Sequence, residues 1–178
     1  MNITVYCGSA SGSSPAYRQS AEETGAWIAR NGYGLVYGAG RVGLMNTVAG
    51  TAKANGGRVI GVIPHFLDSR EGHRDDLDEL ICVETMDERK AKMIELGNAF
   101  LALPGGVGTL EEISQVMALI NLGKLDAPCF LYNKNNFYDD LEAMLDHMAE
   151  ESFFSAEQRG KIYFLTDISQ LSRWLPTV

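Results

Sequence analysis

Short apolar runs alternate with amphipathic segments along the whole chain, and this alternation constrains the fold more than any other feature. Helical patterns occupy residues 16–31, 44–55, 86–97, 108–120, 137–150 and 167–175. Between them lie runs that are typical of buried strands: Ile3–Tyr6, Gly34–Tyr37, Arg58–Ile63, Leu80–Glu84, Ala99–Leu103, Pro128–Tyr132 and Ile162–Leu165. This order predicts an α/β fold, namely a doubly wound, mostly parallel sheet with helices on both faces, in one domain over residues 1–178.

A glycine loop joins the run Ala99–Leu103 to the helical pattern that follows it. The loop reads Pro104-Gly105-Gly106-Val107-Gly108-Thr109 and opens the helix at residue 108. Backbone N–H groups at the start of a helix point outward, and the helix dipole favours negative charge there. The segment therefore predicts a site for an anion such as phosphate.

Thr109 and Glu112 allow two interpretations from their spacing alone. Three residues apart, they share one helical face beside the glycine loop. They also fit T-x-x-E, an ordinary capping box in which Glu112 bonds the backbone N–H of Thr109. The neighbouring Glu111 points about 100° around the helix, so only one of the two carboxylates faces the loop.

Charge and composition exclude several classes of partner. The formal net charge of −8 argues against a nucleic-acid polymer or an anionic membrane surface, because both require a basic patch. No apolar run reaches the roughly 18 residues of a membrane span, and no leader pattern precedes the first strand. Cys7, Cys82 and Cys129 lie in or beside strands without disulfide or metal spacing, which indicates packing. We expect a cytoplasmic protein.

Two further loops follow predicted strands. Residues 7–15 are small and rich in hydroxyl groups, and Ser14 is placed to cap the next helix. This loop is either a flexible turn or a wall of a ligand site. Gly38–Gly43 fits G-x-G-x-x-G, but the acidic residue expected about 20 positions later is absent, which argues against dinucleotide binding. Close approach to another ligand and strand-to-helix packing both remain open.

Two polar segments complete the pattern. Residues 64–78 are predicted to form a polar loop that is functional or mobile, with His65 and His73 as solvated side chains rather than metal ligands. Arg89-Lys90-Ala91-Lys92 places three cations in the first turns of a helix, against its dipole. Either these cations are functional or they pair with neighbouring glutamates.

The motif Pro104–Glu112, P-G-G-x-G-T-x-x-E, together with Met86-Asp87-Glu88-Arg89-Lys90, resembles the Lonely Guy family of cytokinin-activating phosphoribohydrolases. Members of this family are often labelled lysine decarboxylase-like. Tyr37–Met45 resembles the family's G-G-G-x-x-G-L-M loop, and Cys7-Gly8-Ser9 is similar to its first loop. The resemblance implies a modified Rossmann fold, a homodimer and no metal or cofactor. It also implies hydrolysis of a nucleoside 5′-monophosphate, such as an N6-substituted adenosine monophosphate, to a cytokinin or adenine base and ribose 5-phosphate.

By the same resemblance, Arg89 and Glu112 match the catalytic pair. The positions that it implies for substrate binding are Glu71, Lys90, Gly105, Gly106, Val107, Gly108, Thr109, Leu110, Glu111, Ser9, Gly40 and Met45. Ala39 and Asn46 stand where the family commonly has glycine, and Asp87 stands where it often has histidine. These departures bear on the choice of base more than on the chemistry.

The proposed chemistry suits the residue types. Cleavage of a glycosidic bond develops positive charge on the ribose, which a fixed carboxylate at Glu112 would stabilise while the loop amides hold the 5′-phosphate. Arg89 would orient this carboxylate or bind the substrate. Decarboxylation would instead need pyridoxal phosphate on a lysine such as Lys90, and it explains fewer residues. A non-catalytic nucleotide-binding module and a nucleotide-processing enzyme with another leaving group are the remaining hypotheses.

Overall fold

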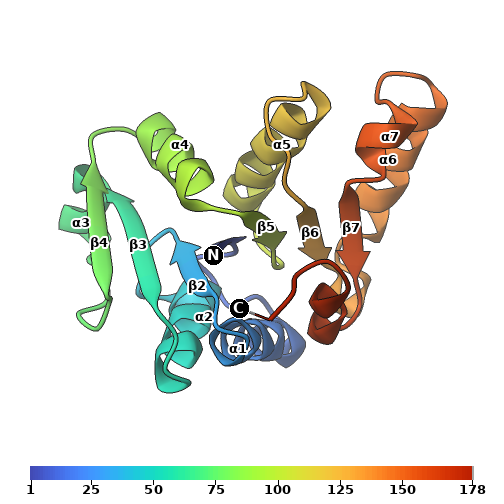
Figure 1. Ribbon diagram of the computed structural model, residues 1–178. Helices are drawn as coiled ribbons and strands as arrows, with labels where there is room; N and C mark the ends of the chain where they lie inside the picture. Colours follow the sequence, from blue (N-terminus) through green and yellow to red (C-terminus); the bar gives the residue numbers. More distant parts are fainter. Residues whose placement is uncertain (178) are drawn as a thin grey trace.

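The computed structural model describes residues 1–177 and shows one seven-stranded sheet (Figure 1). Its strands are β1 (Asn2–Tyr6), β2 (Gly34–Tyr37), β3 (Val59–Pro64), β4 (Glu79–Val83), β5 (Ala99–Ala102), β6 (Cys129–Tyr132) and β7 (Ile162–Leu165). They lie in the order β4-β3-β2-β1-β5-β6-β7, and each neighbouring pair is parallel. The predicted parallel α/β sheet is confirmed.

The strand order reverses between β1 and β5. Ile3 of β1 lies beside Leu35 of β2 on one side and beside Ala99 of β5 on the other. In open α/β sheets, ligands bind beyond the carboxyl ends of the strands at such a switch point. The loops that follow β1 and β5 are therefore the expected walls of a ligand site.

Helices cover both faces of the sheet (Figure 1). One face carries α1 (Pro15–Arg30), α2 (Gly43–Ala54) and the 3₁₀ segment η2 (Ile168–Arg173). The other carries α4 (Met86–Leu96), α5 (Val107–Asn121), α6 (Asp139–Glu150) and the short α7 (Ala156–Arg159). Because the central strands are buried on both sides, they appear in the sequence as continuous apolar runs.

Two helices begin at side-chain caps that the sequence predicts. Ser14 accepts a hydrogen bond from the N–H of Ala16 at 3.3 Å, and proline occupies the first turn of α1. At α4, the Thr85 side chain accepts from the N–H of Glu88 at 3.1 Å. The Glu88 carboxylate, however, accepts from the N–H of Glu84 rather than from that of Thr85. Only one half of the predicted capping box therefore forms.

Three segments differ from the sequence prediction. The polar segment 64–78 contains a helix, α3 (His65–Glu71), which buries none of its residues and so has no amphipathic pattern to reveal it. The helix predicted at 167–175 is the 3₁₀ segment η2, and a second 3₁₀ segment, η1 (Lys134–Asn136), follows β6. Cys7 and Cys129 are buried as predicted, but Cys82 is exposed on the edge strand β4, so the packing interpretation is wrong for it.

Within residues 1–177, every helix is too short or too polar to cross a membrane.

Candidate active site at the switch point

A cavity of about 240 Å³ lies at the carboxyl ends of the central strands. It is bounded by the loops after β1, β2 and β5, by the end of β3, and by side chains from α3, α4 and α5. The lining residues are Cys7, Ser9, Gly38, Gly40, Met45, Ile63, Leu67, Glu71, Arg89, Gly106, Gly108, Thr109 and Glu112. The fold therefore places the predicted glycine loop, Arg89 and Glu112 around one space.

The glycine loop leaves the start of α5 open. Gly106 is the N-cap, and no side chain caps the helix. A Cβ atom added at Gly106 or Gly108 would meet no heavy atom within 4 Å, whereas one at Gly105 would lie 2.2 Å from Thr109 Oγ1. Gly105 is thus needed for packing, while Gly106 and Gly108 leave the first-turn amides accessible to an anion.

The capping-box interpretation of Thr109 and Glu112 is wrong. The helix begins at Val107, so Thr109 is already its third residue rather than its cap. Thr109 is buried beside Gly105, and Glu112 lies in the second turn with its side chain in the cavity. The carboxylate of Glu112 is consequently free of the structural task that its spacing suggested.

The second glycine-rich loop has a different role. The carbonyl of Gly8 accepts hydrogen bonds from the N–H groups of Leu44 and Met45, at 3.1 and 3.3 Å. A Cβ atom at Gly43, whose φ is +60°, would lie 2.1 Å from the carbonyl oxygen of Ser9. The Gly8 carbonyl, in the loop after β1, therefore takes the place that an anion would occupy at the start of α2.

The side chain of Arg89 extends from α4 and forms part of the cavity lining. Its Nε donates to the carbonyl of Val62 at 3.1 Å and its Nη2 donates to the carbonyl of Gly38 at 2.9 Å. The residue is 7% exposed, and its Nη1 lies 3.7 Å from Oε1 of Glu112. These contacts explain why a cation lies in the first turn of a helix, since the guanidinium bonds to carbonyls where β2 and β3 end. They favour an orienting role for Arg89.

Glu112 is a desolvated carboxylate beside one buried cation. Its side chain is 11% exposed. Burial raises the pKa of Glu112 above its ordinary value of 4.5, while the Arg89 guanidinium lowers it. An ionised carboxylate held in this way can stabilise a developing positive charge or orient a water molecule.

Several positions implied by the resemblance lie outside this cavity. Lys90 bonds to Glu111 and lies 3.0 Å from Asp87, so it bridges α4 and α5 at the surface. Val107 and Leu110 are 86% and 43% exposed. These side chains do not line the cavity, whereas Ser9, Gly40, Met45 and Glu71 do.

Four lining residues were not expected from the sequence to belong to the site: Cys7, Gly38, Ile63 and Leu67. Gly38 belonged to a recognised glycine pattern, and a Cβ atom there would lie 1.7 Å from Nη2 of Arg89. Ile63 and Leu67 carry no chemical signal and reach the cavity only through the placement of β3 and α3.

The two histidines of the segment 64–78 make local contacts. His73 Nδ1 lies 2.6 Å from Oδ1 of Asp68, and the backbone of His73 forms an antiparallel bridge with Gly40. His65 lies 3.7 Å from Glu84. In the described part of the chain, no group of three or more potential metal ligands gathers. His73 therefore joins the segment after α3 to the loop that lines the cavity.

Comparison with known proteins shows which family the sequence matches. Residues 45–175 match the family described as "Possible lysine decarboxylase". The chain is 45% identical over 168 residues to the cytokinin riboside 5′-monophosphate phosphoribohydrolase of Rhodococcoides fascians, covering 94% of this chain and 85% of that protein. It is 41% identical over 157 residues to the cytokinin riboside 5′-monophosphate phosphoribohydrolase LOG of Oryza sativa subsp. japonica, covering 88% of this chain and 65% of that protein.

Solved structures share the fold. The molybdenum cofactor carrier protein of Chlamydomonas reinhardtii superposes with a TM-score of 0.72. The match covers 97% of this chain and 94% of that protein at 19% sequence identity. At this identity the likeness supports the modified Rossmann architecture and nothing further.

Proposed function

The chain belongs to the Lonely Guy family, described as possible lysine decarboxylases, and from this premise we propose that it is a nucleoside 5′-monophosphate phosphoribohydrolase. It hydrolyses the N-glycosidic bond of adenosine 5′-monophosphate or an N6-substituted derivative, and it releases adenine or a cytokinin base and ribose 5-phosphate. The observation that carries this proposal is the position of Glu112, beside Arg89 and one turn beyond an open glycine loop. By the same resemblance, we propose a cytoplasmic homodimer.

The loop amides, Glu112 and Arg89 each have a part in this reaction. The amides at the start of α5 hold the 5′-phosphate, since Gly106 and Gly108 leave them open. Water adds to C1′ of the ribose as the C1′–N bond breaks. The electron pair of the C1′–N bond goes to the base, which also receives a proton from the water. Glu112 stabilises the positive charge that develops on the ribose and orients the water. Arg89 keeps Glu112 in place and favours its ionised form.

The other residues that are proposed to bind the substrate fall into two groups, according to whether they line the cavity. Ser9, Gly40, Met45 and Glu71 line the cavity and are proposed to contact the nucleotide there. Lys90, Val107, Leu110 and Glu111 do not line the cavity, and we propose that they contact the part of the nucleotide that extends beyond it.

The proposed function is tested by a base-release assay. The purified chain is incubated with adenosine monophosphate and with an N6-substituted derivative, and free base is measured by chromatography. We expect base release from both monophosphates. Adenosine, which lacks the phosphate, should react roughly 100-fold less efficiently because several charge-assisted hydrogen bonds are lost. Tight nucleotide binding without release of base would instead indicate a non-catalytic binding module.

The pH dependence of turnover should report the state of Glu112. Because burial raises its pKa above 4.5 and the reaction needs the ionised form, kcat should rise with pH through a midpoint above 4.5. The Arg89→Met variant loses the charge that lowers this pKa, so the midpoint of its residual activity should move higher still. A rate profile with its midpoint at or below 4.5 would argue against Glu112 as the ionising group.

A further inference from the structure

A second cavity adjoins the first on the other side of the glycine loop. Its volume is about 310 Å³, compared with about 240 Å³ for the first cavity. Ser9 and Gly106 line both cavities. The two spaces therefore meet at the switch point between β1 and β5, and the reaction assigned above uses only one of them.

Two aromatic side chains form one wall of this second cavity. Tyr17 of α1 and Phe137, which follows η1, pack edge to face with ring centroids 5.6 Å apart. Phe137 is 41% exposed, so protein covers only part of its ring. The small-residue loop 8–12 also lines the cavity, and its Gly12 lies against the Tyr17 ring, since an added Cβ atom there would be 2.7 Å from Cδ2 of Tyr17. The exposed part of the Phe137 ring therefore offers the surface on which a planar aromatic ligand can stack.

The loop that presents Phe137 has two residues in the left-handed region. Asn135 and Asn136 adopt φ values of 55° and 57°, which asparagine accommodates more readily than other non-glycine residues. The Asn135 side-chain amide donates to the hydroxyl of Ser14 at 3.2 Å, next to α1. This hydrogen bond connects the loop that carries Phe137 to the start of α1.

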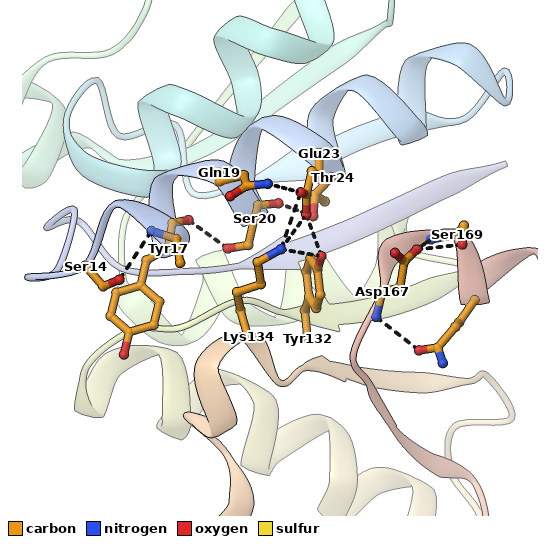
Figure 2. Close-up of polar contacts among 12 residues, drawn as sticks. Ser14, Tyr17, Gln19, Ser20, Glu23, Thr24, Tyr132, Lys134, Asp167 and Ser169 are labelled. Atoms are coloured by element: carbon orange, nitrogen blue, oxygen red, sulfur yellow. Dashed lines mark hydrogen bonds and ion pairs between the residues drawn. The ribbon is translucent and has the colours of Figure 1, made fainter.

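A polar network fastens the same loop to α1 (Figure 2). Glu23 of α1 accepts hydrogen bonds from the hydroxyl of Tyr132 at 2.5 Å and from Nζ of Lys134 at 3.1 Å. Glu23 and Lys134 are ion-paired and neither lines the cavity. The charges of Glu23 and Lys134 therefore compensate each other outside the space.

The residues that line the cavity suit the free base better than the nucleotide or the ribose 5-phosphate of the proposed reaction. None of the described residues that line it carries a charged side chain. A nucleotide and ribose 5-phosphate are both anionic, and of the two glycines whose open amides are proposed to hold the phosphate, Gly106 lines this cavity but Gly108 does not. An anion buried here would therefore have fewer partners than in the first cavity, which is costly. The released base is planar, aromatic and uncharged, and the hydroxyl of Ser11, which lines only this cavity, can bond to its edge.

We propose that this second cavity binds an uncharged planar heterocycle of the class of the released base. The identity of the base rests on the proposed function, but the cavity and its aromatic wall do not. Such a site lets free base bind while a nucleotide occupies the first cavity.

Calorimetry with adenine tests this proposal. The complete chain carrying Glu112→Gln is saturated with adenosine monophosphate, so that the first cavity is filled, and is then titrated with adenine. We expect one further equivalent of adenine to bind per chain. Adding Phe137→Ala should weaken this binding about tenfold, as expected when a base loses an aromatic stacking partner. Phe153→Ala, at a phenylalanine that is 84% exposed and outside this cavity, is the matched control and should leave adenine affinity unchanged.

A cavity-filling variant covers the case in which Phe137→Ala fails to fold. Ala10→Trp places a large side chain in the same space and should also remove the second equivalent. The proposal is overturned if adenine competes with the nucleotide for a single site, or if its affinity is unchanged in both variants. Base release by the unmodified chain is measured separately. Binding that depends on Phe137 without hydrolysis contradicts only the proposed function, whereas hydrolysis without the second equivalent contradicts only this proposal.

Discussion

The Glu112→Gln variant is expected to lose about 10³-fold in kcat while it retains most of its affinity for the nucleotide. Glutamine keeps the size of the side chain but removes the negative charge that faces the ribose. Removing one preorganised electrostatic contact from a water-poor site typically costs about 10²–10³ in kcat. In the proposed mechanism, nucleotide affinity depends mainly on the amides at Gly106 and Gly108, which the substitution does not touch.

Three measurements separate a chemical role of Glu112 from a structural one. The kcat comes from base release, the Kd for adenosine monophosphate from calorimetry and the Tm from thermal unfolding. The Tm should not fall, because Glu112 caps no helix and burial disfavours its ionised form. Glu95→Gln, at an exposed glutamate on α4, is the matched control and should leave kcat unchanged. Normal turnover in Glu112→Gln would remove Glu112 from the mechanism.

Gly38→Ala is expected to reduce kcat/KM by about 100-fold and the free energy of unfolding by roughly 1–3 kcal/mol. The added Cβ atom would lie 1.7 Å from Nη2 of Arg89, so the guanidinium must move. It then loses its hydrogen bond to the Gly38 carbonyl and its position beside Glu112. Gly38 does not have a positive φ, so the effect comes from the clash and not from backbone strain.

A second alanine substitution provides the control for this prediction. At Gly160, where φ is −63°, an added Cβ atom would lie 3.3 Å from the carbonyl oxygen of Glu157. Gly160→Ala should therefore change activity and stability little. Stability is measured by urea unfolding and activity by base release. Unchanged kcat/KM in a folded Gly38→Ala variant would show that the position of Arg89 is unimportant for the reaction.

The sequence predicted the fold well because strand burial and helix periodicity are local signals. Each strand of the sheet was expected within a few residues, since buried parallel strands are continuous apolar runs. The helix α3 was missed for the opposite reason. It buries no residue, so nothing in its spacing distinguishes it from a polar loop.

The candidate site was predictable only in part. The loop from Gly105 to Thr109 was identified from its glycines and its place before a helix. The spacing of Thr109 and Glu112, however, favoured a capping box, because sequence alone does not fix the residue at which a helix begins. The start of α5 at Val107 decides the question.

What the sequence determined by itself was the order of the elements, the existence of two glycine loops and the presence of one cationic motif. Only the tertiary structure decided which loop is open to an anion. The carbonyl of Gly8, just after β1, accepts hydrogen bonds from the amides of Leu44 and Met45 at the start of α2, whereas the amides around Gly108 stay free. The tertiary structure also decided the direction of the Arg89 side chain. Its guanidinium donates hydrogen bonds to the carbonyls of Val62 and Gly38, which are distant along the chain, and so lies beside Glu112. Such contacts depend on which strands become neighbours, and no local pattern in the sequence specifies that.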